Sequence, residues 1–391
     1  MRRVRTAGLF VAGAFTAGVV LLMPAYVSTH TPITTTITFQ KEVSRIFQKK
    51  CFQCHTDGNL AMALTTYKEA RPWAVAIKEE ILERRMPPWS AVSAYGHFSN
   101  DMSLTGREVS LILSWADGGA PSGVLLADED KQPQIVPSLG MWERGAPDLV
   151  IPVAASKKVA ASARDYSTRY DITTTNSTPQ WVRGIQLKPS DRRVVRYGAI
   201  HDATGKWIGT WTPGLPLSML PENAGLRLAA RAKITVEIGY RGTEEEAPAD
   251  AELGFYYAEK APAQTVATFD VTTAPLSIAP GKTGERLRGE MTLKAATTVT
   301  ALWATPGAGA TSVELTAIRP DGDVEPLLFL RYLRPEWPSP YVLREPEALP
   351  AGTRLIVTAY YDNAGDTAIQ AKPAVAIAAS SAALPSASRA R

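Results

Sequence analysis

The pattern of apolar and polar positions divides the chain into a helical part and a longer β part. Between Phe39 and Gly119, apolar residues recur three and four positions apart, the spacing of one helix face. From Leu149 onward, short alternating and β-branched runs are separated by Gly, Pro and Asp turns. The sequence therefore predicts helices first and then strands, without the strand–helix alternation of a parallel sheet.

The helical part is expected to hold three short helices. Met86-Pro87-Pro88 ends the second helix, because proline cannot continue a helix. Thr105 and Glu108 form a capping box at the start of the third, and Gly118-Gly119 ends it. The expected helices cover residues 39–51, 71–85 and 105–117.

The β part contains regularly spaced strands without intervening helices, which is typical of sandwiches and jelly rolls. It exceeds two hundred residues, so two consecutive jelly rolls are expected, divided near Thr272 to Gly284. The segment from Ala374 is rich in Ala and Ser and is expected to be a disordered tail. The expected strands include 181–187, 193–200, 233–240, 252–257, 298–303, 312–318 and 354–361.

The N-terminus combines Arg2, Arg3 and Arg5 with an uncharged apolar run over residues 7–27. This run is long enough to span a bilayer as a helix, with the arginines on the cytoplasmic side. A secretory signal is the competing interpretation. We expect an uncleaved single-pass anchor in the cell membrane, with the bulk of the protein on the periplasmic side.

The fold class that follows is a multidomain α plus all-β protein: a transmembrane helix, a small all-α domain and two β-sandwiches. A chain of 391 residues is long enough for several cores. Its net charge of +4, without a dense basic stripe, does not indicate a nucleic-acid partner. The expected parts are an anchor (1–27), a tether (28–38), a helical domain (39–123), a linker (124–148), jelly rolls (149–274 and 275–366) and a tail (367–391).

The chain has two cysteines, and both belong to the motif Cys51-Phe52-Gln53-Cys54-His55. C-x-x-C-H is the pattern of covalent haem attachment, in which each thiol adds to one vinyl group and the histidine binds iron. A disulfide, a zinc half-site and a redox dithiol are the alternatives. Zinc would need two more ligands, whereas His30, His97 and His201 are scattered. We therefore predict one covalent haem c, held by Cys51 and Cys54, with His55 as the proximal iron ligand.

The distal iron ligand needs a separate argument. Thioether sulfur is a soft ligand that raises the reduction potential. Met86 is the first candidate, since the two prolines after it would hold it rigidly. Met62, Met102 and His97 remain alternatives.

Several stretches carry a resemblance to a known arrangement. Arg85-Met-Pro-Pro-Trp, Tyr95-Gly-His-Phe-Ser-Asn-Asp and Trp115-Ala-Asp-Gly-Gly-Ala-Pro resemble the cytochrome c module found ahead of copper type II ascorbate-dependent monooxygenase-like domains. Trp211-Thr-Pro-Gly and Tyr360-Tyr-Asp-Asn are similar to parts of the two tandem jelly rolls of that family, whose members include peptidylglycine α-hydroxylating monooxygenase and dopamine β-hydroxylase. The resemblance covers roughly residues 39–365.

The chain departs from that family at the copper ligands. The place of the paired histidines is Arg196-Tyr197, and the later histidine place is Gly239. No histidine follows His201, which is expected to be a surface-loop residue, and Met291 is the only methionine of the second jelly roll. Imidazole is the ligand type that these coppers need, so no copper is expected.

The sequence thus predicts an electron-transfer protein and not an enzyme. Its β part would serve for docking or for assembly with redox proteins or with subunits of a membrane redox complex. The first alternative is a haem-fed copper-dependent monooxygenase with unusual ligands. The second is a structural subunit whose haem mainly supports folding.

Overall fold

The computed structural model describes residues 34–123, 141–215, 217 and 219–382. The predicted membrane segment at 7–27 and most of the predicted linker lie outside these residues. Within the described part of the chain, no helix is long and apolar enough to cross a membrane.

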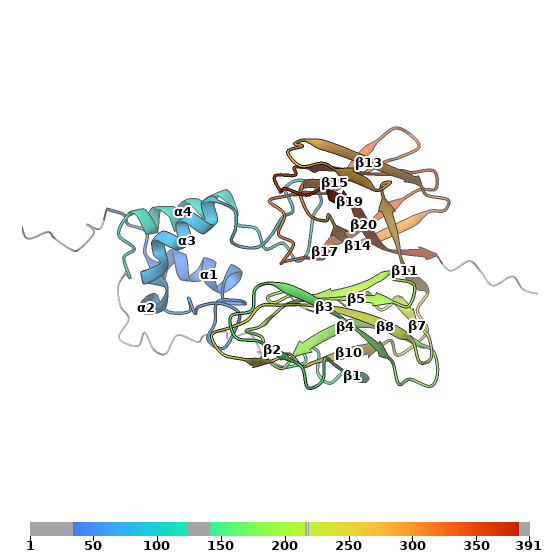
Figure 1. The fold of residues 1–391 in the computed structure, drawn as a ribbon, viewed down its shortest axis with the longest axis horizontal. Coiled ribbons are helices and arrows are strands. Elements are labelled where there is room, and N and C mark those ends of the chain that lie inside the picture. The colour runs from blue at the N-terminus through green and yellow to red at the C-terminus, as the bar shows by residue number, and fades with distance from the viewer. Residues whose placement is uncertain (1–33, 124–140, 216, 218, 383–391) are drawn as a thin grey trace, which may run out of the picture.

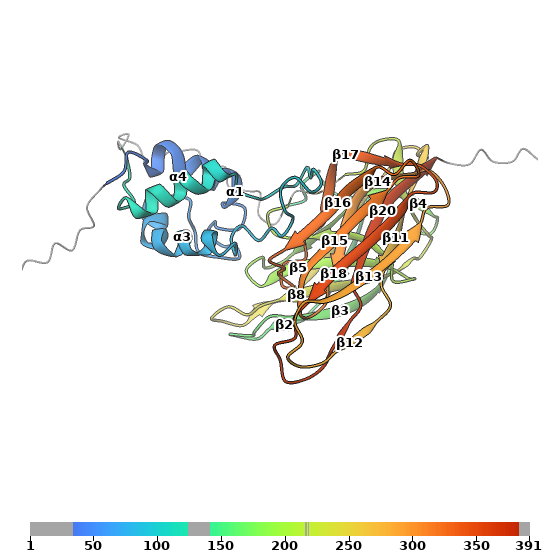
Figure 2. The same ribbon diagram turned by 90° about the horizontal axis from the view of Figure 1, so that it is seen from above.

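Residues 34–123 form a small helical unit at one end of the molecule (Figures 1 and 2). The third expected helix is observed as α4, which begins after Thr105 with the capping box to Glu108 and ends before Gly118. The second expected helix is divided into a short 3₁₀ turn and α3. The elements are η2 (Phe39–Val43, a π turn), α1 (Ser44–Lys50), α2 (Tyr67–Ala70), η3 (Arg71–Trp73), α3 (Ala74–Leu82) and α4 (Gly106–Asp117).

Aromatic side chains form the core of the helical unit. The Phe39 and Phe47 rings lie 6.1 Å apart, and each lies near the fully buried Trp115 ring. The Trp115 indole N–H donates to the Pro121 carbonyl at 3.1 Å, which satisfies its polar atom. These contacts fix α1 and α4 together and leave the residues after α1 in a defined position.

The β part consists of two jelly rolls that share one large sheet. In the first sandwich (149–257), the strand order is β1-β10-β4-β7 in one sheet and β3-β8-β5-β6 in the other. In the second sandwich (264–382), it is β11-β20-β14-β17 and β13-β18-β15-β16. Counted from the first main strand of each sandwich, both orders are 1-8-3-6 and 2-7-4-5, which is the arrangement of an eight-stranded jelly roll.

The strands of the first sandwich are β1 (Leu149–Val153), β2 (Lys158–Val159), β3 (Tyr166–Thr173), β4 (Gln180–Pro189), β5 (Val195–Asp202), β6 (Trp207–Trp211), β7 (Ala224–Leu228), β8 (Lys233–Tyr240), β9 (Ala247–Pro248) and β10 (Ala251–Tyr257). Those of the second are β11 (Gln264–Thr272), β12 (Leu276–Ile278), β13 (Glu285–Thr292), β14 (Thr297–Thr305), β15 (Ala310–Ile318), β16 (Val324–Arg331), β17 (Tyr341–Leu349), β18 (Arg354–Tyr361), β19 (Ile369–Ala371) and β20 (Ala374–Ala382).

The boundary expected between the jelly rolls was wrong by one strand. Strand β11 pairs along its whole length with β20, and only Gln264, Thr265 and Val266 pair with β7. The second jelly roll therefore begins at Gln264 and not at residue 275. The Pro and Gly residues near 275–284 mark a connection inside the second sandwich, which sequence cues of turns cannot tell from a domain boundary.

The expected disordered tail was also wrong up to residue 382. Strand β20 lies between β11 and β14 in the centre of the sheet, and Val375 and Ile377 are fully buried. The segment misled the prediction because alanine has a low strand propensity. It is also buried at successive positions, so it lacks the alternation of a half-exposed strand.

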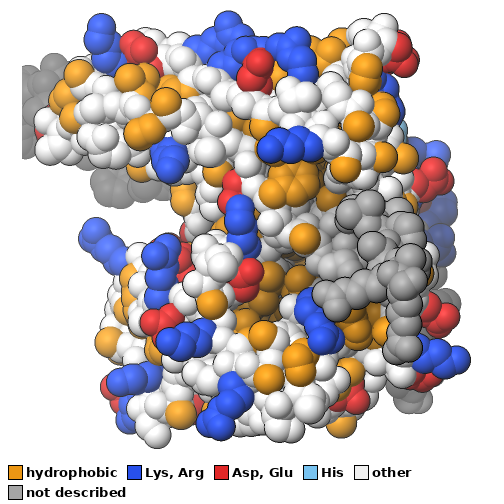
Figure 3. Space-filling model, turned by 90° about the vertical axis from the view of Figure 1, so that its right-hand side faces the viewer, with side chains coloured by type: hydrophobic (Ala, Val, Ile, Leu, Met, Phe, Trp, Pro, Cys, Tyr) orange, Lys and Arg blue, Asp and Glu red, His pale blue; other side chains and the backbone are white. Residues whose placement is uncertain are grey.

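The two sandwiches pack on each other through a small aromatic cluster. The Trp207 and Trp303 rings are stacked with centroids 5.9 Å apart, and His201 lies against Trp303 at 5.4 Å. His201 is thus a half-buried strand residue at this interface, and its expected place in a surface loop was wrong. From the side away from the helices, the sandwiches form two lobes with a hollow between them (Figure 3).

Candidate haem-binding site

The C-x-x-C-H motif forms a tight turn directly after α1. The Cys51 N–H donates to the Phe47 carbonyl, and both the Cys54 and His55 N–H groups donate to the Cys51 carbonyl at 3.0 and 2.9 Å. Phe47 is fully buried in the helical core, so the turn has a rigid support. The backbone therefore holds both thiols and the imidazole in one short segment.

This turn forms part of the wall of a cavity of about 500 Å³. The size lies within the range of small-molecule and cofactor sites, about 300–1,000 Å³. The helical unit supplies most of the lining, including the apolar Phe47, Leu64, Ile77 and Leu104. Both sandwiches complete the lining with Asp165, Arg196, Thr212, Pro213, Leu215, Arg241, Arg334, Glu336, Trp337 and Ser339.

The cavity contains the three residues expected to hold the haem. Cys51 and Cys54 are free thiols in this structure. Burial raises the pKa of Cys51 to about 12 and that of Cys54 to about 11. Both thiols are therefore neutral at physiological pH as long as no metal ion is bound to them.

His55 is oriented by a hydrogen bond from its ring. Its Nδ1 lies 3.0 Å from the Met62 carbonyl oxygen, which can only accept, so Nδ1 carries the proton. The other nitrogen, Nε2, is then free of its proton and available to a metal. Burial lowers the pKa of His55, which keeps the imidazole in the neutral form that binds iron.

The candidate distal ligands differ in whether they line the cavity. Met86, Met62 and Met102 all line it, whereas His97 does not. His97 is exposed, and its carbonyl accepts from the Arg344 N–H at the second sandwich. The structure therefore places the three methionines on the cavity that the motif also lines, and it leaves His97 outside this lining.

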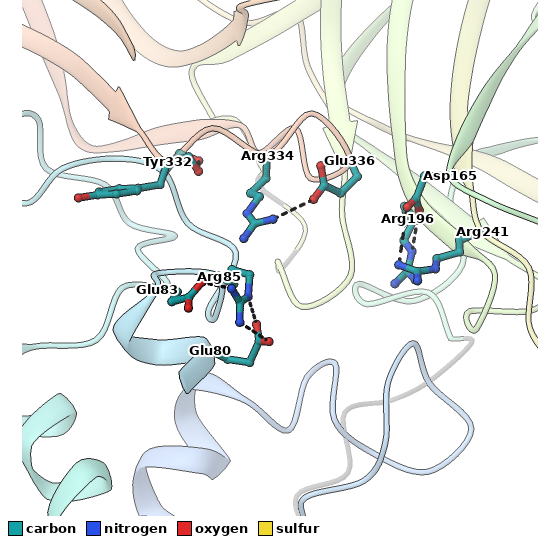
Figure 4. A network of polar contacts seen from close by, with 10 residues as sticks. Glu80, Glu83, Arg85, Asp165, Arg196, Arg241, Tyr332, Arg334 and Glu336 are labelled. Atoms are coloured by element: carbon teal, nitrogen blue, oxygen red, sulfur yellow. Dashed lines mark hydrogen bonds and ion pairs between the residues drawn. The ribbon is translucent and has the colours of Figure 1, made fainter. Parts of the chain in front are cut away.

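Basic side chains outnumber acidic ones around the cavity. The lining includes five basic residues (Lys50, Arg85, Arg196, Arg241 and Arg334) and three carboxylates (Glu80, Asp165 and Glu336). Figure 4 shows the ion pairs that three parts of the chain contribute: Glu80 with Arg85, Glu336 with Arg334, and Asp165 with Arg196 and Arg241. The excess of two positive charges suits a ligand with two carboxylates, such as the propionates of haem.

The Trp211-Thr-Pro-Gly stretch of the first sandwich contacts the C-x-x-C-H motif at Cys54. Cys54 Sγ is 3.6 Å from the Pro213 carbonyl oxygen. A Cβ at Gly214 would lie 3.2 Å from Cys54 Sγ, so glycine allows the close approach. Thr212 Oγ1 is buried at the cavity wall without a hydrogen-bond partner, and such a group favours a polar ligand inside the cavity.

The positions where copper ligands would be expected in the first sandwich are occupied by residues other than histidine. Tyr197 and Gly239 are directly opposite in the β5–β8 pair, and the Tyr197 ring covers Gly239. The Tyr197 hydroxyl donates to Glu237 at 2.9 Å. Arg196 lines the cavity described above, and its guanidinium lies over the Trp337 ring of the second sandwich at 5.2 Å. Among the described residues, no group of three or more His, Cys, Asp or Glu side chains is placed to hold a metal ion.

Sequence reasoning missed the contribution of the β part to this cavity. The Trp211-Thr-Pro-Gly motif was visible, but nothing in the sequence indicated that it meets residues 51–55. Arg196, Arg241 and Arg334 also gave no local signal, because their convergence depends on the packing of three separate units.

Comparisons with known proteins identify no family. No protein-family model matches the chain, and no curated protein matches it in sequence. Among solved structures, the major capsid protein P2 of bacteriophage PM2 matches 61% of this chain and 99% of its own, with 11% identity and a TM-score of 0.25. The Sulfolobus turreted icosahedral virus structure covers 59% of this chain and 61% of its own at 9% identity and a TM-score of 0.21. These similarities are too weak to support an argument about function.

Proposed function

We propose that the protein is an exported, membrane-anchored c-type cytochrome that carries electrons through one covalent haem. The single observation that carries the proposal is the convergence of Cys51, Cys54, His55 and Met86 on one cavity of about 500 Å³. When bound, the haem would accept and release one electron at a time.

The residues of the cavity have distinct parts in this proposal. Cys51 and Cys54 would hold the haem through thioether bonds, and His55 would bind iron through Nε2 while Met62 fixes its ring. Met86 is the proposed distal ligand. The excess of basic residues would neutralise the two propionates, and the unpaired Thr212 hydroxyl would find a partner there.

The proposed role of the β part is docking and assembly without copper chemistry. Tyr197 and Gly239 stand where the resemblance would require histidines, and the phenol of Tyr197 is engaged with Glu237. Arg196 is directed to the cavity that would hold haem and is paired with Asp165 at 3.7 Å. These residues support a scaffold whose former metal positions now serve the neighbouring cytochrome. The partners would be redox proteins or subunits of a membrane redox complex.

The test is a haem and copper count on full-length protein isolated from membranes, with the co-purifying subunits identified. We expect one covalent haem per chain, no copper and retained redox subunits. Stoichiometric copper with ascorbate-driven hydroxylation would establish the copper monooxygenase instead. A chain without covalent haem would refute the proposal altogether.

A further inference from the structure

Residues 89–100, here called the docking segment, connect the helical unit to the second sandwich. Ala91 forms a β-bridge with Leu330 of β16, and Phe98 forms one with Leu343 of β17. β16 and β17 are the end strands of the two facing sheets. The docking segment therefore closes one side of this sandwich, and Figure 1 shows it leaving the helices for that edge.

Hydrogen bonds extend both bridges. At β16, the Val92 N–H donates to the Phe329 carbonyl at 2.8 Å. At β17, the Ser99 N–H donates to the Val342 carbonyl, also at 2.8 Å. Because both ends of the segment are paired in this way, its position is set by the sandwich and not by the helices.

An aromatic cluster anchors the start of the docking segment. The Trp89 ring lies 5.0 Å from the Tyr341 ring and 6.0 Å from the Phe98 ring, and Phe98 and Tyr341 are 5.4 Å apart. Phe98 and Tyr341 are each only 4% exposed. All three side chains pack on the core of the second sandwich. Buried aromatic clusters of this kind stabilise the packing by more than their buried apolar area alone would give.

Met86 lies in the chain between the end of α3 and the aromatic cluster that begins at Trp89. On one side, the Met86 N–H donates to the Glu80 carbonyl at 3.2 Å. On the other, only Pro87 and Pro88 separate Met86 from Trp89, and the Trp89 N–H donates to the Pro87 carbonyl at 2.8 Å. Proline fixes its own φ angle, so the connection has little freedom. The position of Met86 is thus determined jointly by α3 and the second sandwich.

We propose that the second sandwich positions Met86 as the distal haem ligand, with Trp89 and Tyr341 as positioning residues. The inference rests on the proposed cytochrome function and adds a part for the β unit beyond docking. A methionine side chain is flexible and has three rotatable bonds. Its sulfur stays near the iron only if its backbone is held, and Trp89 and Tyr341 supply that restraint.

The test compares full-length variants by two measurements, the near-infrared sulfur-to-iron band and the midpoint potential. Trp89→Leu and Tyr341→Leu should keep the covalent haem but lose the band and lower the potential, which is also the result expected for Met86→Ala. Tyr341→Phe keeps the ring and should retain both properties. Tyr361→Leu is the matched control, because Tyr361 is buried in the same sandwich but is separated from the docking segment by β15 and β16.

The outcomes separate this inference from the function on which it rests. An unchanged band in Trp89→Leu and Tyr341→Leu, or an equal loss in Tyr361→Leu, would overturn the positioning role. A band that survives Met86→Ala would overturn it as well, because Met86 would not be the ligand. Absence of covalent haem from the wild-type chain would refute the proposed function itself. If the leucine variants do not fold, Trp89→Phe should lose the band at a lower temperature than Tyr361→Phe, and equal temperatures would refute the inference.

Discussion

The contact between Gly214 of the first sandwich and the C-x-x-C-H motif can be tested by adding a single methyl group. Gly214 has φ +83°, and a Cβ there would lie 3.2 Å from both Cys54 Sγ and the Gln53 Cβ. Gly205 has almost the same backbone, with φ +80°, but nothing lies within 4 Å of its Cβ position. The pair Gly214→Ala and Gly205→Ala therefore separates the cost of the backbone from the cost of the contact.

The expected magnitudes follow from these two geometries. Alanine in the left-handed region costs roughly 1–2 kcal/mol, and this is the whole effect expected for Gly205→Ala. Gly214→Ala adds the displacement of Cys54 and Gln53, and overpacking of this kind costs about 1–3 kcal/mol. A change of 1 kcal/mol shifts the midpoint of thermal unfolding by about 2–4 °C in a domain of this size. The midpoint of Gly214→Ala should therefore fall further than that of Gly205→Ala by on the order of 5 °C.

The assay is thermal unfolding of the full-length protein, followed by circular dichroism at matched concentration and pH. The yield of covalent haem is measured in parallel, since the contact lies beside Cys54. Equal midpoints for the two variants would refute the reasoning, because the first sandwich would then have no energetically important contact with the motif.

Three further predictions concern charge, the C-terminal strand and pH. Arg196→Gln should lower the midpoint potential of the haem, because a cation near the cavity disfavours the oxidised form. Arg227→Gln removes a similar contact with a tryptophan away from the cavity, and it should leave the potential unchanged in the same redox titration. Truncation after Ala382 should leave the thermal midpoint unchanged, whereas truncation after Pro373 deletes the central strand β20 and should yield insoluble or unfolded protein by circular dichroism. Glu237 is partly buried, which alone would raise its pKa, but hydrogen bonds from Arg169 and Tyr197 outweigh the burial and lower the pKa. The stability that Glu237 contributes is therefore present above pH 4.5, and it is lost as the pH falls through the folded-state pKa. Urea unfolding of Glu237→Gln should accordingly show a smaller loss of stability between about pH 5 and 3 than the wild type does.

Local signals in the sequence predicted local structure well. Thr105 and Glu108 marked the start of α4, because a capping box is formed by residues only three positions apart. The end expected for the first helix, at residue 51, lies one residue beyond the observed end of α1 at Lys50. Spaced β-branched runs predicted the sandwiches, since the alternation of a half-buried strand is also a local property.

Features that depend on distant parts of the chain could not be predicted in this way. Strand β20 is central because of its partners β11 and β14, and its alanines carry no signal of that environment. The docking segment was expected to be a loop of the helical domain, yet its backbone is paired with two strands more than two hundred residues later. The charged lining of the cavity likewise needs Arg196 and Arg334 from separate sandwiches.

The three units therefore constrain the cavity from different sides. The first sandwich meets the motif at Cys54 through Gly214, and the second meets the Met86 connection through Trp89. The two sandwiches are joined by the shared sheet and by the Trp207–Trp303 stack. A cytochrome on such a support would have its attachment side and its distal side fixed relative to each other. A helical unit joined only by a flexible linker would lack that restraint, because its aromatic core around Trp115 does not include residues 86–100.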